Sequence, residues 1–492
     1  MMNKKHKALV LIFIIHHSAF IILSVGCGAR RTPDLERIFA AASKRTGKRP
    51  IIVIPGVLGS QIVNRRTGEV VWPSAFRSSV DGLSLPATPD LAANRDDLVA
   101  GKILETARLA RIAPEFYVYH GLLEALRRYG GYREGDWENP PLDGDRDTFY
   151  VFAYDWRRDN VETARELVSR VESLKQKLGS ADLRFNVVAH SMGGLVARYA
   201  AMYGARDLPP EGAAPRPTWE GASFVNKIFM VGVPNEGSAE AFATLLEGYS
   251  VTEGLRRRVR LLNQLSREDA LSAPSIFQLM PHGGRARFFD ENLRPLSLDL
   301  YDPEVWKRYG WSAVNDPDFR ASYARGEIRN QESPTHKGTL EELDAYFAAV
   351  LKRARRFHEA LDAPDSTAPA PVALFAFGGD CEETLAAPLV VRDERRGRFL
   401  TLTRPRALRA ADGRRIPRRE VVRAMYEPGD GRVSRESLLG SNLGGARAAG
   451  GFYGTPLHVA YAAFACDFHS ELHNNLTLQD NALTLLVNEL MN

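Results

Sequence analysis

The sequence predicts an α/β fold with a mostly parallel central sheet covered by helices. Short apolar runs without alternation recur along the chain, at residues 50–54, 149–153, 185–189, 227–231 and 372–377. Such runs are typical of parallel strands, because helices bury both faces of the sheet that they form. Helical patterns lie between several of them, and residues 161–178 are one example, with apolar side chains at helical spacing and charges between. Strands and helices that alternate in this way favour layers of helices around one sheet.

Besides the apolar strands and the alternating helices, a serine at a sharp strand-to-helix turn supports this fold class. The predicted strand 185–189 runs into Ser191, and a helical pattern follows directly. Ala189 and Gly193 flank the serine, and both must be small because the strand and the helix pass close together at such a turn. The usual first flank is glycine, so Ala189 departs from the pattern by one methyl group. We therefore expect Ser191 to present its hydroxyl as a nucleophile; the alternative is a serine that only caps the following helix.

Size and charge limit the classes of protein that fit. The chain has 492 residues, 44% of them apolar, which is enough for one large domain with insertions or for two domains. Its 65 basic and 60 acidic residues leave a net charge of +5, so the composition gives no indication of a nucleic-acid partner.

The N-terminus has the pattern of an export signal over residues 1–27. Three lysines precede an apolar run that reaches Val25, and Gly26 then precedes Cys27. This end resembles the lipobox of bacterial lipoproteins, in which the cysteine is acylated, although Ser24 stands where leucine is usual. We expect an exported protein on the periplasmic face of a bacterial membrane, attached through Cys27. Ordinary secretion and an uncleaved anchor are the alternatives.

The other two cysteines, Cys381 and Cys466, would lie in an oxidising compartment after export, where they are candidates for one disulfide. Two unpaired buried thiols are the alternative. The cysteines have no His or Cys partners at ligand spacing, which argues against structural zinc. We expect neither a metal nor an organic cofactor.

The pattern along the chain divides it into a core and an insertion. Residues 28–49 read as a linker, 50–238 and 362–492 as the two parts of the core, and 239–361 as a helical cap inserted over the carboxyl ends of the strands. Ligands of such sheets bind at that edge, so a cap would cover them; helices that only pad the sheet are the alternative. The arginine-rich residues 392–423 read as a solvated hairpin or as a basic face that meets anionic lipid headgroups.

A nucleophilic serine needs a base and a carboxylate that orients the base. Asp430 lies in a tight Gly-x-Gly turn, and His469 follows the last apolar run. The order serine, acid, histidine is that of α/β hydrolases, which favours Asp430 and His469 as the partners of Ser191. Asp380 and His473 are the competitors. For the oxyanion hole the order predicts the backbone amide of Met192 and one from the loop after residues 50–54, Val57 or Leu58.

Several motifs together resemble the lecithin:cholesterol acyltransferase family. They are Ile54 to Gln61, Tyr154 to Arg157, Ala189 to Gly194, Gly232 to Gly237, Pro274 to Pro281 and Gly429 to Gly431. The resemblance implies an α/β hydrolase that forms an acyl-serine from a lipid ester and passes the acyl group to water or an alcohol. It assigns Ser191 as nucleophile, Asp430 as orienting acid, His469 as base, and the amides of Val57 and Met192 as the oxyanion hole. The chain departs from the family at Arg432, where threonine is usual, and in residues 232–237.

These observations predict a serine lipase or acyltransferase that acts on phospholipid or acylglycerol esters at a membrane interface. Two alternatives remain open at this point. One is a serine esterase or thioesterase of soluble substrates, because the same three residue types serve all of these reactions. The other is an envelope lipoprotein that binds lipid without catalysis. The segment Tyr154 to Arg157 either shapes the pocket or ties two strands together.

Overall fold

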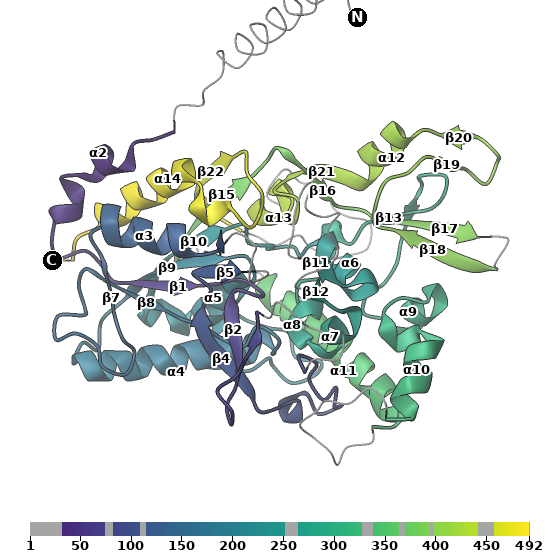
Figure 1. The fold of residues 1–492 in the computed structure, drawn as a ribbon, viewed down its shortest axis with the longest axis horizontal. Coiled ribbons are helices and arrows are strands. Elements are labelled where there is room, and N and C mark those ends of the chain that lie inside the picture. The colour runs from purple at the N-terminus through teal and green to yellow at the C-terminus, as the bar shows by residue number, and fades with distance from the viewer. Residues whose placement is uncertain are drawn as a thin grey trace, which may run out of the picture.

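A computed structural model (Figure 1) describes residues 32–73, 82–108, 115–250, 264–326, 338–363, 370–393, 397–440 and 457–491. The predicted export signal, residues 1–27, and the predicted lipidation site at Cys27 lie outside these residues. Among the described residues, no helix has the length and apolarity needed to cross a bilayer.

The core is one seven-stranded sheet in which every neighbouring pair is parallel. Its order is β22-β15-β10-β9-β1-β8-β7. The strands are β1 (Ile51–Ile54), β7 (Arg133–Glu134), β8 (Thr148–Val151), β9 (Phe185–His190), β10 (Val225–Val231), β15 (Ala373–Gly379) and β22 (Val459–Ala465). The predicted parallel α/β fold is confirmed, and all five apolar runs form strands of this sheet.

Alternate residues of each strand pack on opposite faces of the sheet. In β1, Ile52 and Ile54 lie in one hydrophobic cluster, whereas Ile51 and Val53 lie in another, and all four side chains are buried. The first cluster includes residues of α4 (Asn160–Leu178), α5 (Met192–Tyr203) and α11 (Leu340–Leu361), and the second includes residues of α2 (Leu35–Phe39), α3 (His120–Glu124) and α14 (Leu476–Val487). Figure 1 shows helices on both sides of the sheet. The continuous apolar runs are therefore explained by burial on both faces.

The predicted cap segment contains most of the remaining helices. They are α6 (Ala239–Glu247), α7 (Arg267–Ser272), α8 (Pro274–Phe277), α9 (Pro303–Tyr309), α10 (Pro317–Ala324) and α11, with the short strands β11 (Tyr249–Ser250), β12 (Gln264–Leu265), β13 (Phe288–Phe289) and β14 (Pro295–Leu296). Helix α11 also packs on the core, because Tyr203 of α5 donates a hydrogen bond to the carbonyl of Ala360 at 2.8 Å. The last helix of the segment thus covers the sheet as well.

Residues 389–425, which we name the arginine arm, extend away from the central sheet (Figure 1). The arm consists of β17 (Leu389–Asp393), β18 (Arg398–Leu402), β19 (Leu408–Arg409), β20 (Arg415–Ile416) and α12 (Arg418–Met425). Two antiparallel strands, β16 (Glu382–Leu385) and β21 (Tyr426–Gly429), connect it to the core. Strand β17 of the arm pairs with β13 of the predicted cap segment.

Three smaller elements complete the fold near the carboxyl edge of the sheet. Strands β2 (Ser60–Asn64), β3 (Val70–Trp72) and β4 (Leu98–Ile103) form one antiparallel sheet, and β5 (Thr106–Arg108) pairs with β6 (Glu115–Tyr117). A short helix, α13 (Arg435–Leu439), follows the Gly-x-Gly turn.

Candidate active site

The candidate site residues meet at the carboxyl edge of the central sheet. Ser191 directly follows β9, the loop with Val57 follows β1, and His469 follows β22. Asp430 lies against the end of β15, because a Cβ added to Gly379 would be 2.8 Å from the Cβ of Asp430. Parallel strands all end at one edge, which is why segments so far apart in the sequence converge here.

Ser191 occupies a strained backbone conformation, with φ 52° and ψ −128°. A positive φ is rare for a residue with a side chain and costs on the order of 1–3 kcal/mol. Its neighbours must be small: a Cβ on Gly193 would lie 2.5 Å from the Pro55 carbonyl oxygen, and one on Gly56 would lie 2.7 Å from the Cβ of Ser191. The amide of Ser191 donates to the carbonyl of Val231 at 2.8 Å, which fixes the turn to the neighbouring strand.

Ser191, His469 and Asp430 form a continuous hydrogen-bonded row. The Nε2 atom of His469 lies 2.9 Å from the Ser191 Oγ, and its Nδ1 lies 2.8 Å from Oδ2 of Asp430. A carboxylate accepts hydrogen bonds, so Nδ1 carries the imidazole proton and Nε2 is free to accept from the serine hydroxyl. All three residues are at most 8% exposed. The arrangement can transfer a proton from the hydroxyl to the imidazole.

Backbone amides hold the carboxylate of Asp430 in place. Its Oδ1 accepts hydrogen bonds from the amides of Arg432 at 2.9 Å and Val433 at 2.7 Å. Its carbonyl accepts from the amide of His469 at 2.9 Å, so the acid and the base are also joined through the main chain. Oδ2 is therefore left to orient the imidazole.

Val57 and Met192, whose amides are expected to form an oxyanion hole, both lie close to the nucleophile. Met192 opens α5, so its amide belongs to the helix N-terminus, and Val57 lines the cavity beside Ser191. Neither amide has a hydrogen-bond acceptor among the described residues. Leu58, the other expected donor, has φ 62°, and its carbonyl accepts from the indole of Trp72.

Two buried rings, His190 and Tyr119, connect this loop to the loop that carries His469. The Nε2 of His190 lies 3.1 Å from the carbonyl oxygen of His469, and its Nδ1 lies 2.7 Å from the hydroxyl of Tyr119. The carbonyl can only accept, so Nε2 donates, Nδ1 of the neutral ring accepts, and Tyr119 donates to it. The Tyr119 oxygen in turn accepts from the amide of Gly56 at 2.8 Å. One chain of hydrogen bonds thus runs from the loop after β1 to the main chain of His469.

The pKa shifts in this cluster keep the supporting rings neutral. Burial lowers the pKa of His190 well below its ordinary value, and the nearby His473 and His469 lower it further. Burial also lowers the pKa of His473 to about 4 and raises that of Tyr119. A neutral His190 ring can donate from Nε2 and accept at Nδ1, and a neutral Tyr119 can donate to that Nδ1, as the hydrogen bonds require.

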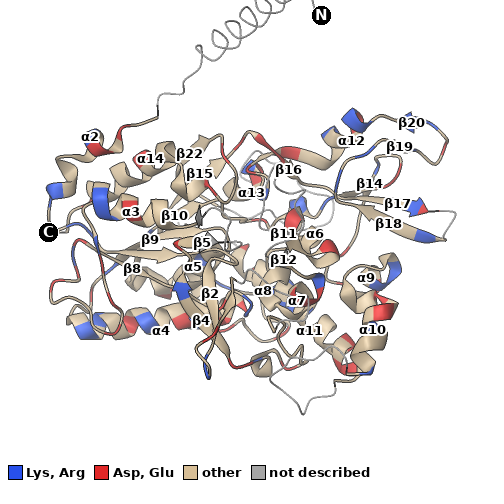
Figure 2. Cartoon of the chain, viewed as in Figure 1, with Lys and Arg blue, Asp and Glu red and all other residues tan. Residues whose placement is uncertain are grey.

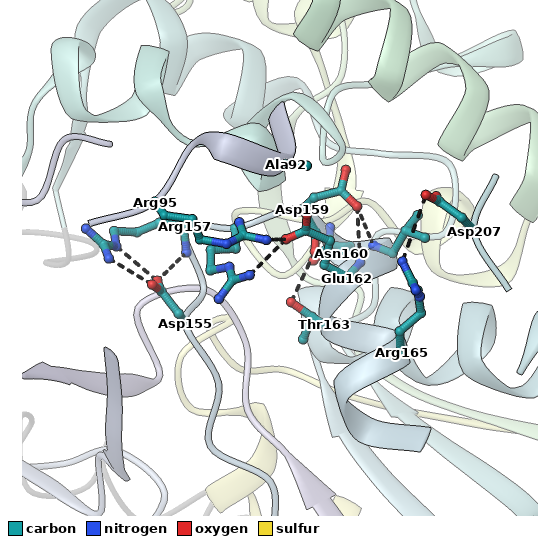
Figure 3. Close-up of polar contacts among 12 residues, drawn as sticks. Ala92, Arg95, Asp155, Arg157, Asp159, Asn160, Glu162, Thr163, Arg165 and Asp207 are labelled. Carbon is teal, nitrogen blue, oxygen red and sulfur yellow. Dashed lines mark hydrogen bonds and ion pairs between the residues drawn. The ribbon is translucent and has the colours of Figure 1, made fainter. Parts of the chain in front are cut away.

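The segment Tyr154 to Arg157 braces the loop that follows β1. The Tyr154 hydroxyl donates to the carbonyl of Pro55 at 2.9 Å, and the Trp156 indole donates to the carbonyl of Ser60 at 3.2 Å. Arg157, 1% exposed, pairs with Asp155 at 2.8 Å and with Asp96 at 2.6 Å. Figure 3 shows Arg157 beside Asp155. Of the two predicted roles, these contacts support the structural one.

The start of α4 joins the same region to the cap. Asp159, at the N-terminus of α4, accepts from the amides of Val161 and Glu162, and Figure 3 shows it beside Glu162. Its carboxylate also pairs with Arg353 of α11 at 3.0 Å. Gln278, in the loop after α8, donates to the same carboxylate at 2.8 Å. Asp159 is 4% exposed, so this is a buried junction of core and cap.

An apolar cavity of about 160 Å³ opens onto the Ser191 hydroxyl. Its apolar walls come from the loop after β1, from cap helix α6 and from the residues around α8, and they include Val57, Leu58, Ala241, Leu265, Ile276 and Leu279. Two charged residues also line the cavity, and they pair with each other: Arg432 lies 3.2 Å from Glu240, and its guanidinium lies 4.3 Å from the ring centroid of Tyr249. The cap therefore contributes directly to the cavity, whose mainly apolar walls fit an apolar group.

Neither competitor residue takes part in the row of Ser191, His469 and Asp430. Asp380 approaches Arg435 at 3.9 Å and is not in the row with His469. His473 lies in a short 3₁₀ helix, Leu472–Asn474, where its Nε2 donates to the carbonyl of Val118 at 2.6 Å. Its ring stacks on Tyr119 with centroids 4.4 Å apart. Helix α14 begins only at Leu476, so His473 and His469 do not share a helical face.

A disulfide joins Cys381 and Cys466, with their Cα atoms 5.2 Å apart. The two cysteines follow the neighbouring strands β15 and β22, so the bond ties together the strand ends that precede Asp430 and His469.

Sequence reasoning missed Tyr119 and the partners of His190. Tyr119 precedes α3 in a segment without a recognisable motif, and its contact with residue 190 depends on the packing of α3 behind the sheet. His190 directly precedes the nucleophile, and it is buried. The only signal of a polar role is the imidazole itself.

The comparisons with known proteins agree with the motifs. The family model "Lecithin:cholesterol acyltransferase" matches residues 111–328. No curated protein sequence matches the chain. Among solved structures, one of the Tle4-Tli4 complex is similar with a TM-score of 0.51 and 16% identity, covering 90% of this chain and 98% of that chain. A lipase of Bacillus licheniformis, BlEst2, is similar at a TM-score of 0.32 and 10% identity, covering 90% of this chain and 92% of that chain.

The structural similarity supports the fold, and the family model supports the resemblance drawn from the motifs. The matched region includes Ser191, the Tyr154 to Arg157 segment and most of the cap segment. Over residues 111–328, the chain is similar to the lecithin:cholesterol acyltransferase family model.

Proposed function

We propose that this protein is a serine hydrolase or acyltransferase that cleaves phospholipid or acylglycerol esters through an acyl-serine intermediate. The single observation that carries the proposal is the row Ser191, His469, Asp430, with 2.9 Å and 2.8 Å between its members. The apolar cavity beside the hydroxyl and the family match support a lipid as the substrate class.

In the first half-reaction, the Ser191 oxygen attacks the ester carbonyl while its proton passes to Nε2 of His469. Asp430 stabilises the imidazolium that forms. The amides of Val57 and Met192 donate to the oxyanion, and each such donor contributes on the order of 3 kcal/mol in known enzymes. When the intermediate collapses, Nε2 returns the proton to the leaving alcohol and the acyl group stays on Ser191.

In the second half-reaction, water or an acceptor alcohol gives a proton to His469 and attacks the acyl-serine. Collapse releases the acid or the new ester, and the proton returns to Ser191. No step in this scheme requires a metal or an organic cofactor.

Two measurements test the proposal. Ser191→Ala should abolish turnover of a short p-nitrophenyl ester while leaving the thermal melt unchanged, because the hydroxyl is the nucleophile. Lipid-product mass spectrometry on mixed phospholipid and acylglycerol micelles should show free acid or transferred acyl chains with the wild type alone. A rate that rises when the substrate passes into micelles favours a lipase over an esterase of soluble substrates.

We also propose that the protein is exported and held at the periplasmic face of a bacterial membrane. The N-terminal pattern ending at Cys27 supports export, and the disulfide between Cys381 and Cys466 fits an oxidising compartment. Metabolic labelling with a palmitate analogue should mark the wild type and not Cys27→Ser. Equal labelling of both would contradict lipidation at this residue.

A further inference from the structure

The arginine arm concentrates positive charge in one part of the chain. Residues 392–423 contain twelve arginines and four acidic residues, whereas the whole chain has a net charge of +5. This short segment therefore carries more positive charge than the net charge of the protein. Figure 2 shows blue segments on α12 and on the hairpins of the arm.

The arginines of the arm point to solvent. Every one of the ten that the structure describes is exposed: Arg392, Arg398, Arg404, Arg406, Arg409, Arg414, Arg415, Arg418, Arg419 and Arg423. Among the described residues, the one ion pair that this set makes joins Arg414 to Glu420 at 3.6 Å. Elsewhere on the surface, arginines commonly have carboxylate partners, as Arg170 has in Glu166 at 2.6 Å. The arm is therefore a concentrated source of uncompensated positive charge.

The arm presents these arginines on a folded scaffold. Leu389, Leu402, Ile416, Val421 and Met425 form a buried cluster beneath it. On α12, Arg419 and Arg423 lie one turn apart on the face opposite Val421 and Met425. The charged face is thus fixed in place by an apolar one.

The scaffold also contacts the wall of the cavity. Ala239 and Ala243 of α6 belong to the buried cluster of the arm, whereas Ala241 and Thr244 of the same helix line the cavity. Thr403 donates a hydrogen bond to Glu247 at the end of α6 at 2.6 Å. Helix α6 therefore contacts the arm with some of its residues and lines the cavity with others.

We propose that the arginine arm is the docking surface for a membrane that contains anionic phospholipids. Guanidinium groups bind phosphate in a bidentate manner, and clustered basic side chains are attracted to the negative potential of such a membrane. The inference rests on the proposed lipid substrate, which is the reason to expect a bilayer rather than another polyanion. Docking through the arm would hold the protein at the surface where its substrate lies.

The test uses the full chain with Ser191→Ala, so that binding is measured without turnover. Vesicles of phosphatidylcholine alone are compared with vesicles that also contain phosphatidylglycerol, by co-sedimentation. We expect stronger binding to the anionic vesicles, falling as salt is added. Adding Arg415→Glu, Arg419→Glu and Arg423→Glu should weaken that binding roughly tenfold or more.

A matched control makes the same change of charge away from the arm, with Arg128→Glu, Arg165→Glu and Arg170→Glu. These exposed arginines lie on other elements, and the control should bind within about twofold of its parent. Thermal melts check that both variants fold.

Three results would overturn the proposal: equal binding to both kinds of vesicle, equal loss in the arm and control variants, or displacement of the protein from anionic vesicles by a small molar amount of duplex DNA. Turnover of the short ester by the wild type tests the proposed function separately. Vesicle binding without any turnover would reject the enzyme and retain the docking surface.

Discussion

The Tyr119 hydroxyl lies 2.7 Å from Nδ1 of His190, and this hydrogen bond links the two loops that the proposed chemistry needs. On one side, Tyr119 holds the amide of Gly56, the residue before Val57. On the other, His190 holds the carbonyl of His469. The proposed oxyanion donor and the proposed base are therefore positioned by one buried chain of neutral groups.

Replacing Tyr119 by phenylalanine should lower kcat about tenfold with little change in KM for a short ester. The change removes the two hydrogen bonds that the hydroxyl makes with Gly56 and His190, which position the loops, and one such bond contributes about 1 kcal/mol. The free energy of unfolding should fall by about 1–3 kcal/mol, because Nδ1 of His190 is left buried without a partner. Steady-state kinetics and urea unfolding measure the two effects.

Tyr199→Phe is the matched control. Tyr199 is also buried, and its hydroxyl donates to the carbonyl of Arg206 at 3.3 Å, away from the site. This variant should lose some stability and keep its kcat. Equal kcat values for the two variants would argue against the positioning role of Tyr119.

Replacing Arg157 by alanine should lower the free energy of unfolding by about 3–5 kcal/mol. It leaves Asp155 and Asp96 buried without their cation, and breaking a buried ion pair is costly for that reason. The neighbouring Arg158→Ala removes a more exposed pair with Glu162 at 3.1 Å and should cost less than about 1 kcal/mol. Denaturant unfolding of the two variants side by side checks this; similar losses would mean that the buried position of Arg157 is not what matters.

Replacing both Cys381 and Cys466 by serine should lower stability by about 2–4 kcal/mol, since the disulfide closes a long loop in the unfolded chain. The two cysteines are 85 residues apart in the sequence. Thermal melts with and without dithiothreitol measure the loss. The reductant should destabilise the wild type and have no effect on the double variant, and a wild type that is insensitive under unfolding conditions would contradict the disulfide.

Acid should destabilise the fold partly through His473. Its pKa is about 4 in the fold, below the value of about 6.5 for an exposed histidine, because the ring is buried. Between these two values the unfolded chain binds a proton that the folded chain does not, so the free energy of unfolding falls as the pH drops from about 6.5 to about 4. The expected contribution is on the order of 3 kcal/mol.

His473→Gln isolates this contribution, since an amide can still donate to the carbonyl of Val118. The variant should lose less stability than the wild type when the pH is lowered from 7 to 4.5. His190 titrates in the same direction but is present in both proteins. Urea unfolding at the two pH values measures this loss of stability. Identical losses in the variant and the wild type would show that His473 does not contribute to the destabilisation by acid.

Much of the fold follows from the sequence because the central sheet has a strong local signal. Burial on both faces requires continuous apolar strands, and the close approach of β9 and α5 requires small residues around Ser191. The arginine arm has no such signal, because its strands are short and only partly buried, and such strands look the same whether they belong to a core, a cap or a loop. Its pairing with β13 depends on contacts about a hundred residues apart.

The part of the candidate site that follows a known order of residues along the chain could be predicted from the sequence. The part that depends on tertiary packing could not. The sequence order of Ser191, Asp430 and His469 predicts residues that the structure brings within hydrogen-bonding distance. The contact between Tyr119 and His190 cannot be predicted from the order of motifs, because it depends on how α3 packs against the sheet.

The most direct test of the central claim is covalent labelling with a fluorophosphonate probe, followed by peptide mass spectrometry. We predict one adduct, on the Ser191 oxygen. The rate of labelling should fall by several orders of magnitude in His469→Ala, because the base is lost. A wild-type protein that folds but does not label, or that labels on another serine with Ser191 unmodified, would contradict it.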